Sequence, residues 1–337
     1  MIPHNKPSLD DLEIKAAARV ITSGWVAQGE EVKIFEDEFC AYHGLPSGNA
    51  VAVSSGTAAL FLALWVLNVR NELIDIPAYA CTALQNAVYW SGGKPNYLDN
   101  AYDSPNVHPD FINNSDAKFA IVQHTYGIPI DVTQINRKIV IEDCCQALGA
   151  EIHGQKVGLF GEISTFSFYA TKLITSGGQG GMVLSKEKSL IDKIKDFRNF
   201  DQKNDGKGRF NFQMTDLQAA IGRVQLTKLD MFLSKRSSVY NSYKNNGIYL
   251  LDSKDDKVKP VRYRAITYCN DVNQTIKNYK KNKISIINPF TSEEILGDVK
   301  NNPNAAEISL KTISLPIYPN LKKHEIAKII KTYNALK

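Results

Sequence analysis

Short apolar runs alternate with helical segments up to about residue 185, and this alternation constrains the fold more than any other feature of the sequence. The runs Asn49–Val53, Phe119–Gln123 and Lys138–Glu142 are too short for helices and are typical of buried strands. Between such runs, Ala58–Leu67 and Thr82–Trp90 have the length and apolar content of helices. Strands and helices that alternate in this way form a mostly parallel sheet with helices on both faces. The sequence therefore predicts an α/β fold.

The pattern changes after residue 186, where amphipathic helices and lysine-rich strands follow one another. A polar, glycine-bearing loop is expected over Asp201–Gly208. The expected elements of this half are helices over Ser189–Phe200, Met214–Phe232 and Leu229–Asn245, strands over Lys257–Tyr268, Ile284–Ile287 and Ile313–Pro316, and a final helix over Lys322–Leu336.

Composition excludes several classes of protein. The 337 residues carry 40 Lys and Arg against 35 Asp and Glu, and this mild charge of +5 is spread along the chain, which does not indicate a nucleic-acid binder. The longest apolar run, Ala58–Leu67, is too short to span a bilayer, and the N-terminus lacks the apolar core of a signal peptide. Five cysteines without a paired spacing fit reduced thiols. We therefore expect a cytoplasmic enzyme that binds neither membrane nor nucleic acid.

The small residues Ser54-Ser55-Gly56-Thr57-Ala58 lie between an expected strand and an expected helix. A helix N-terminus offers free N–H groups and the positive end of a dipole, which suit a phosphate. An ordinary helix cap with a tight turn is the alternative, because Ser and Thr are common capping residues.

Two acids, Glu142 and Asp143, end an apolar strand. Ligands of open α/β sheets lie beyond the carboxyl ends of strands, so a carboxylate here could hold a protonated heterocycle nitrogen. The alternative is a solvated strand end or a helix cap. Neighbouring Cys144 and Cys145 favour buried thiols over a zinc site, and no metal site is expected.

Lys172 follows an expected strand and precedes the glycine-rich turn Ser176–Gly181. Loss of solvation would lower the pKa of this lysine and suit Schiff-base chemistry, whereas an ordinary surface lysine is the alternative. The order of the three features matters. A phosphate cradle, a strand-end acid and a strand-end lysine are together what a pyridoxal-phosphate site requires.

The sequence resembles the sugar aminotransferases of the DegT/DnrJ/EryC1/StrS family. The matching stretches run in family order over most of the chain; they are Ser23–Phe39, Ala52–Leu60, Ile76–Val88, Gly92–Asp99, Gln123–Asp131, Ile141–Ala150, Phe166–Val183, Phe210–Leu226 and Ile313–Leu321. The resemblance implies the fold type I of pyridoxal-phosphate enzymes, with a large cofactor domain over residues 15–235. It also implies a smaller C-terminal α+β domain over residues 236–337, against which residues 1–14 pack.

The resemblance assigns roles to individual positions. Lys172 matches the lysine that carries the cofactor, and Asp143 matches the acid paired with the pyridine nitrogen. Gln146 matches a residue close to the cofactor. The phosphate contacts implied in the same chain are Gly56, Thr57, Ala58 and Ser167. Asn211 matches an asparagine that reaches the cofactor phosphate of the neighbouring subunit, which implies a homodimer with shared active sites.

Several positions depart from the family pattern. The aromatic residue that often covers the cofactor ring is Cys81 here, so either Cys81 or Tyr79 would contact the ring or the substrate, with Cys81 favoured. Gln213 replaces a common arginine after Asn211. Trp25 would pack on the sugar, or else is a core aromatic at a helix end. The weakest match is residues 262–304, where the chain is short for the family and a more open substrate cleft is expected.

The resemblance implies transfer of an amino group from an amino acid, most simply glutamate, to a keto group of a nucleotide-diphosphate-linked sugar, for surface-polysaccharide or glycoconjugate synthesis. Three alternative functions fit the sequence less well. Dehydratases or deoxygenases of the family replace the lysine with histidine, and Lys172 argues against them. A non-catalytic regulator on the same fold is disfavoured because Lys172 and Asp143 are both retained. A nicotinamide-dependent enzyme would need a GxGxxG turn where this chain has SSGTAAL.

Overall fold

The computed structural model describes residues 1–136 and 138–336, so Lys337, the last residue of the expected C-terminal domain, lies outside it. The elements of the first half are α1 (Asp11–Ser23), α2 (Glu30–Tyr42), β1 (Ala50–Val53), α3 (Gly56–Val66), β2 (Leu73–Pro77), α4 (Ala83–Trp90), β3 (Lys94–Leu98), α5 (Pro109–Asn113), β4 (Phe119–Gln123), β5 (Ile139–Asp143), β6 (Glu151–Ile152), β7 (Gln155–Lys156) and β8 (Ile163–Ser167). Those of the second half are β9 (Gly181–Leu184), α6 (Lys188–Arg198), α7 (Asp216–Thr227), α8 (Leu229–Asn245), β10 (Val258–Lys259), β11 (Ala265–Tyr268), α9 (Val272–Lys281), α10 (Pro303–Lys311), β12 (Thr312–Leu315) and α11 (Lys323–Leu336).

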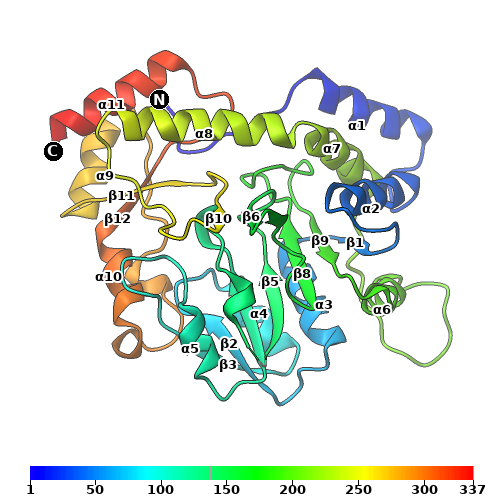
Figure 1. Ribbon diagram of the computed structural model, residues 1–337. Helices are drawn as coiled ribbons and strands as arrows, with labels where there is room; N and C mark the ends of the chain where they lie inside the picture. Colours follow the sequence, from blue (N-terminus) through cyan, green and yellow to red (C-terminus); the bar gives the residue numbers. More distant parts are fainter. Residues whose placement is uncertain (137, 337) are drawn as a thin grey trace.

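A seven-stranded sheet in the order β1-β9-β8-β5-β4-β2-β3 forms the centre of the described chain (Figure 1). Its strand pairs are parallel except where β9 lies antiparallel between β1 and β8. Because β1, β5 and β8 therefore point the same way, their carboxyl ends meet at one edge of the sheet. The expected α/β fold with a mostly parallel sheet is confirmed.

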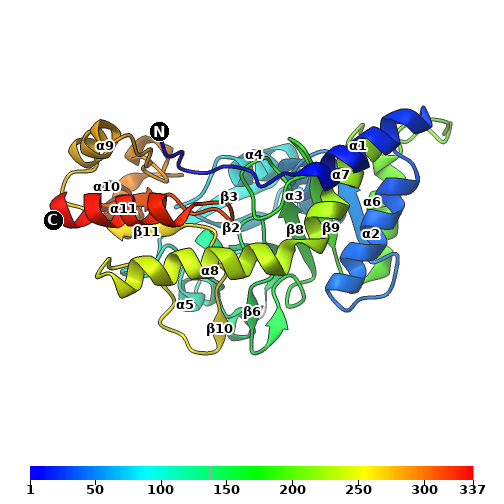
Figure 2. The ribbon, with the colours of Figure 1, turned by 90° about the horizontal axis from the view of Figure 1, so that it is seen from above.

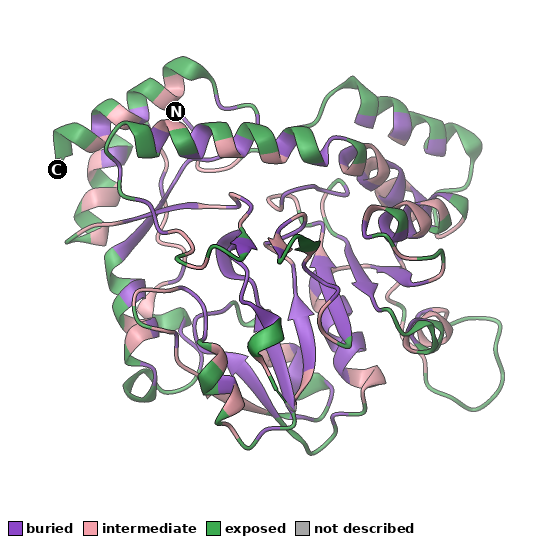
Figure 3. Ribbon diagram, viewed as in Figure 1, coloured by how far each residue is buried: buried purple, intermediate pink, exposed green. Residues whose placement is uncertain are grey.

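Strands β1 and β4 are buried on both faces, as the apolar runs of the sequence indicate (Figure 3), whereas the edge strand β3 is only partly buried. Alternate residues enter separate clusters, because side chains along a strand point to opposite faces. In β1, Ala50 and Ala52 join the cluster that includes α2, whereas Val51 and Val53 join the cluster that includes α3. Helix α3 is buried along nearly its whole length and fixes one face of the sheet.

The C-terminal part is built around the antiparallel pair β11–β12 and helices α8, α9 and α11, which share one apolar cluster. Helix α8 has the expected bounds and runs from α7 to this part (Figure 1). The N-terminal segment reaches the same cluster, because Ile2 is buried there and bridges to Ile284 (Figure 2). The domain boundaries at residues 15 and 235 stay a prediction.

Three expected elements differ from the structure. The expected strand Ile284–Ile287 is wrong: only isolated bridges occur at its two ends, and its alternating isoleucines reflect burial of an irregular segment. The expected strand Lys257–Tyr268 is divided into β10 and β11. The expected helix Met214–Phe232 is divided at Lys228, where α7 ends and α8 begins. Helices α9 and α10 were not foreseen.

None of the helices in residues 1–136 and 138–336 is long and apolar enough to cross a membrane.

Candidate active site

The turn between β1 and α3 meets the ends of β5 and β8. A methyl group on Gly56 would lie 2.7 Å from Cβ and 3.0 Å from Oγ of Ser167, and 3.4 Å from Sγ of Cys145. Gly181, at the start of β9, is equally close, because a methyl group there would lie 2.4 Å from the carbonyl oxygen of Ser55. The β1–α3 turn therefore packs against the Ser167 side chain on one side and against the backbone of β9 on the other, and a side chain at position 56 or 181 would require these neighbours to shift.

This turn has the form of an anion cradle. Ser55 caps α3, and its Oγ accepts a hydrogen bond from the amide of Ala58 at 3.1 Å. The amides of Gly56 and Thr57 open the helix, where no acceptor exists four residues earlier in the helix. These amides and the Ser167 hydroxyl can therefore face a phosphate group. The structure thus brings together Gly56, Thr57 and Ser167, three of the expected phosphate contacts.

Asp143 ends β5 beside this turn and is 4% exposed. Its Oδ1 accepts a hydrogen bond from the amide of Cys145 at 3.1 Å. Burial raises the pKa of the Cys145 thiol well above its ordinary value, and the negative charge of Asp143 adds to this effect. The neighbouring thiol is therefore neutral, and Asp143 is the group at this strand end that can face a positively charged ring nitrogen.

Glu142 points to the opposite face of the sheet and is fully buried. Its carboxylate accepts hydrogen bonds from the amides of Gly158, Phe160 and Gly161 at 2.7–2.8 Å and from His124 Nε2 at 3.1 Å. Although the two acids are adjacent in sequence, only Asp143 is available to a ligand.

His124, Glu142 and Cys144 bring possible metal-binding atoms within 4.8 Å of one another. The backbone amide of Ile130 donates to His124 Nδ1 at 3.1 Å, and His124 Nε2 faces Glu142. Because these hydrogen bonds already occupy His124 and Glu142, the two side chains form a buried polar network that joins β4 to β5.

Lys172 lies in the turn after β8, and the side-chain amide of Asn5 donates to the carbonyl of the preceding Thr171 at 2.8 Å. Its Nζ is 5.5 Å from the centre of the Tyr263 ring. Burial acts to lower the pKa of Lys172. Tyr263, then Cys145 and Asp143, act in the opposite direction, and the pKa is raised above its ordinary value of 10.5. The expected lowering of the Lys172 pKa by desolvation is therefore wrong, because the combined effect of Tyr263, Cys145 and Asp143 outweighs burial.

The remaining expected contacts surround this centre. Gln146 is fixed by the amide of Tyr126, which donates to its Oε1 at 2.8 Å. Tyr79 is fully buried, and its hydroxyl is 2.7 Å from that of Tyr126, whereas Cys81 is exposed just before α4. This placement leaves Cys81 the more accessible of the two side chains, and a substrate contact by Tyr79 stays a prediction. Trp25 is 60% exposed between α1 and α2.

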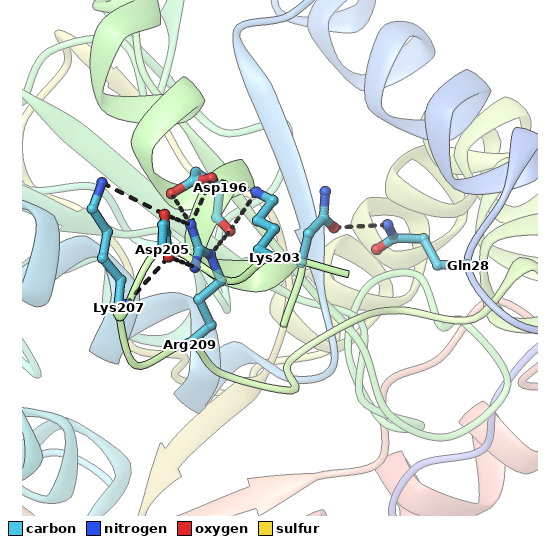
Figure 4. Close-up of polar contacts among 7 residues, drawn as sticks. Gln28, Asp196, Lys203, Asp205, Lys207 and Arg209 are labelled. Carbon is cyan, nitrogen blue, oxygen red and sulfur yellow. Dashed lines mark hydrogen bonds and ion pairs between the residues drawn. The ribbon is translucent and has the colours of Figure 1, made fainter. Parts of the chain in front are cut away.

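Asn211 is exposed, and its neighbour Phe212 accepts a hydrogen bond from the amide of Ser54 at 2.8 Å. The loop before it, residues 199–210, is held by ion pairs (Figure 4). Arg209 binds Asp196 at 3.1 Å and Asp205 at 2.6 Å. Further contacts in the figure join Lys203 to Asp196, Lys207 to Asp205 and Gln28 to Asn199. The polar loop expected over Asp201–Gly208 is thus present and anchored.

Sequence reasoning did not identify Tyr263 and Arg264, which lie in the stretch with the weakest family match. The Arg262-Tyr263-Arg264 run in a chain otherwise rich in lysine was the available signal. Tyr263 is 5% exposed and stands between the Lys172 turn and β11.

The residues at this edge of the sheet fit the expected cofactor. The glycine at position 56 leaves the amides of α3 open to a phosphate, a buried carboxylate lies at the end of β5, and a half-buried lysine follows β8. These groups can serve as a phosphate anchor, a partner for the pyridine nitrogen and a Schiff-base amine.

A sequence profile described as the DegT/DnrJ/EryC1/StrS aminotransferase family matches residues 7–334. GDP-perosamine synthase of Escherichia coli O157:H7 is 29% identical over 99% of this chain and 98% of its own length. GDP-perosamine synthase of Vibrio cholerae is 34% identical over 73% of this chain and 70% of its own length. A putative sugar aminotransferase from Streptococcus pneumoniae, solved in its PLP form, superimposes with a TM-score of 0.89 at 25% identity, covering 99% of this chain and 98% of that one.

Proposed function

This chain belongs to the DegT/DnrJ/EryC1/StrS aminotransferase family, and we propose that it transfers the amino group of an amino acid, most simply glutamate, to a keto group of a nucleotide-diphosphate-linked sugar. It is a sugar aminotransferase, and its cofactor is pyridoxal 5′-phosphate. The nucleotide-linked acceptor is supported by relatives that are GDP-perosamine synthases. A role in making a surface polysaccharide is supported by the likeness to a spore coat polysaccharide biosynthesis protein of Bacillus subtilis.

The observation that carries the proposal is the meeting of Lys172, Asp143 and the Gly56–Ser167 contact at one edge of the sheet. When bound, pyridoxal phosphate supplies an electron sink for negative charge at the donor α-carbon. Asp143 keeps the ring nitrogen protonated, because an opposite charge stabilises the charged form.

Lys172 has two tasks in this proposal. It would hold the cofactor covalently, and once released its Nζ would act as the base and acid that moves the proton of the donor α-carbon. The acceptor keto group receives the amine by the same steps in reverse. A histidine at position 172 could not hold the cofactor in this way, which is why the dehydratase alternative is set aside.

We also propose that the enzyme is a homodimer whose sites are shared. Support comes from the exposure of Asn211 on a segment that runs beside the β1–α3 turn. Exposed apolar side chains on α1 and after it, among them Leu12, Ile21 and Trp25, offer surface that a partner subunit could cover.

The test uses purified, cofactor-loaded protein. We expect the long-wavelength absorbance of the cofactor to fall when glutamate is added, with 2-oxoglutarate formed, and to return when a nucleotide-linked ketosugar is supplied. Lys172→Ala should lose the reaction, whereas Lys188→Ala, an exposed lysine paired with Asp192, should keep it. Full turnover in the Lys172→Ala variant, or no reaction of the wild type with any amino acid, would overturn the proposal.

A further inference from the structure

Arg264 and Lys172 both lie close to the ring of Tyr263. The side chain of Lys172 comes from the turn after β8, and Arg264 comes from the segment that leads into β11. The Lys172 ammonium is 5.5 Å and the Arg264 guanidinium is 5.2 Å from the centre of that one ring. A second cation therefore approaches the same aromatic ring as the reactive lysine.

The charge of Arg264 is not balanced by an acid. Among residues 1–136 and 138–336, no carboxylate forms an ion pair with it, whereas Arg262, two positions earlier, pairs with Asp252 at 2.5 Å. The polar group that meets Arg264 is His4, whose Nε2 lies 3.3 Å from Nη1 and 2.8 Å from the hydroxyl of Ser314. A guanidinium can only donate, so His4 accepts from it and holds it in place without neutralising it.

A further cation raises the positive potential at this point. Arg236 is fully buried, and its Nη1 donates to the carbonyls of Tyr263 and Ile317 at 3.3 and 2.9 Å rather than to a carboxylate. Burial, then Arg264 and Arg236, lower the pKa of His4 to about 3, so this histidine stays neutral. The partly buried Arg264 guanidinium is surrounded by neutral and positive groups and therefore lacks a counter-ion. A bound anion would supply one.

We propose that Arg264 binds the α-carboxylate of the amino-acid donor. This inference rests on the proposed function, in which Lys172 acts on the donor α-carbon, and it adds the residue that orients the donor. The α-carboxylate is bonded directly to that carbon, so it must lie close to Lys172. The diphosphate of a nucleotide sugar is attached at the anomeric carbon and lies across the sugar ring from a keto group at the far side.

The departures of this sequence agree with that assignment. Gln213, two positions after Asn211, is uncharged and supplies no guanidinium there. Arg264 lies in the stretch of weakest family resemblance and presents the planar pair of donors that matches a carboxylate.

The decisive experiment compares Arg264→Gln with Arg262→Gln, a matched loss of charge on the same segment. Cofactor-loaded proteins are titrated with glutamate and, separately, with a nucleotide-linked ketosugar, and the apparent dissociation constant of each is measured from the cofactor absorbance. Arg264→Gln should raise the apparent dissociation constant of glutamate by about tenfold to a hundredfold, because one charge-assisted contact is lost. The apparent dissociation constant of the sugar should rise by less than about twofold. Arg262→Gln should change neither constant appreciably. Arg264→Lys keeps the positive charge but not the planar pair of donors, so its dissociation constant for glutamate should lie between those of wild type and Arg264→Gln. This variant replaces Arg264→Gln if Arg264→Gln does not fold.

A second readout does not depend on turnover. Glutarate, which has the carboxylates of glutamate but no amine, should bind wild type and Arg262→Gln in calorimetry and bind Arg264→Gln at least about tenfold more weakly. An unchanged glutamate constant in Arg264→Gln, or a larger effect on the sugar than on glutamate, would overturn the inference and in the second case assign Arg264 to the diphosphate. A wild type that reacts with no amino acid would instead contradict the proposed function, so the two failures are distinguishable.

Discussion

Two adjacent carboxylates on β5 have opposite tasks, because neighbouring side chains of a strand point to opposite faces. Asp143 meets the site with one backbone hydrogen bond, whereas Glu142 is enclosed by three amides and His124. The first can serve a ligand because its hydrogen-bonding capacity is not used up. The second holds the segment Gly158–Gly161 against β5 and thereby fixes the strand end on which Asp143 stands.

Glu142→Gln tests that supporting role. A glutamine amide would put a donor among backbone donors, so we expect the free energy of unfolding to fall by about 3 kcal/mol, as for a broken buried charge network. Denaturant unfolding at neutral pH measures this. Glu162→Gln, an exposed acid on the neighbouring strand connection, should stay within about 0.5 kcal/mol of wild type.

The Glu142 carboxylate also makes the stability of the protein depend on pH. Burial alone would raise the pKa of Glu142, but hydrogen bonds from His124 and from the amides of Gly161 and Gly158 hold it below its ordinary value of 4.5. Its contribution to stability is therefore complete above pH 4.5 and is lost as the pH falls through the lower folded-state pKa. Wild type should lose stability over that range more steeply than Glu142→Gln, and equal slopes would contradict this account.

At the scale of elements, the sequence patterns predicted the regular buried strands correctly and failed for buried segments of irregular backbone. The strands of the central sheet are short and apolar on both faces, so their runs identified them. Ile284–Ile287 has the same alternation without a ladder, because its isoleucines enter the C-terminal cluster from an irregular segment. Likewise, the order of cradle, acid and lysine could be predicted, but the approach of Tyr263 and Arg264 could not, because it depends on packing of distant segments.

The loop before Asn211 is held in place by ion pairs that its amino-acid composition alone does not predict. Its polar sequence suggests mobility, yet the Arg209 side chain is 4% exposed between Asp196 and Asp205. Arg209→Ala should speed amide hydrogen exchange across residues 199–210 by about tenfold or more, because the loop then opens locally. Lys207→Ala removes a side chain that is 59% exposed and 3.9 Å from Asp205, and it should leave exchange unchanged. Equal exchange in both variants would show that the ion pairs do not anchor the loop.

At the scale of the whole molecule, the site lies where three parts of the chain meet: the carboxyl edge of the sheet, the N-terminal segment and the segment that leads into β11. Asn5 contacts the residue before Lys172, and His4 contacts Arg264. If Arg264 binds the donor as proposed, the small C-terminal part contributes to the substrate side of the site and the sheet contributes the cofactor side. Because this part is also where the sequence departs most from the family pattern, differences in substrate choice are expected to arise there.

The proposed dimer makes a prediction that no single-chain account makes. If Asn211 serves the neighbouring subunit's site, the Lys172→Ala and Asn211→Ala chains should complement each other. In their heterodimer, the chain that retains Lys172 receives Asn211 from the Lys172→Ala partner, so one of the two sites is intact. Co-expression with two different affinity tags and tandem purification isolates this heterodimer, and its activity should be about half that of wild type.

The two parent variants provide the baseline for this experiment. The Lys172→Ala homodimer lacks the reactive amine in both sites, and the Asn211→Ala homodimer lacks the amide that would reach the phosphate. If Asn211 acts within its own chain, no site of the heterodimer contains both residues, and activity stays at the level of the Asn211→Ala chain. Restoration therefore requires a site built from two chains, which is what the exposed position of Asn211 beside the β1–α3 turn leads us to expect.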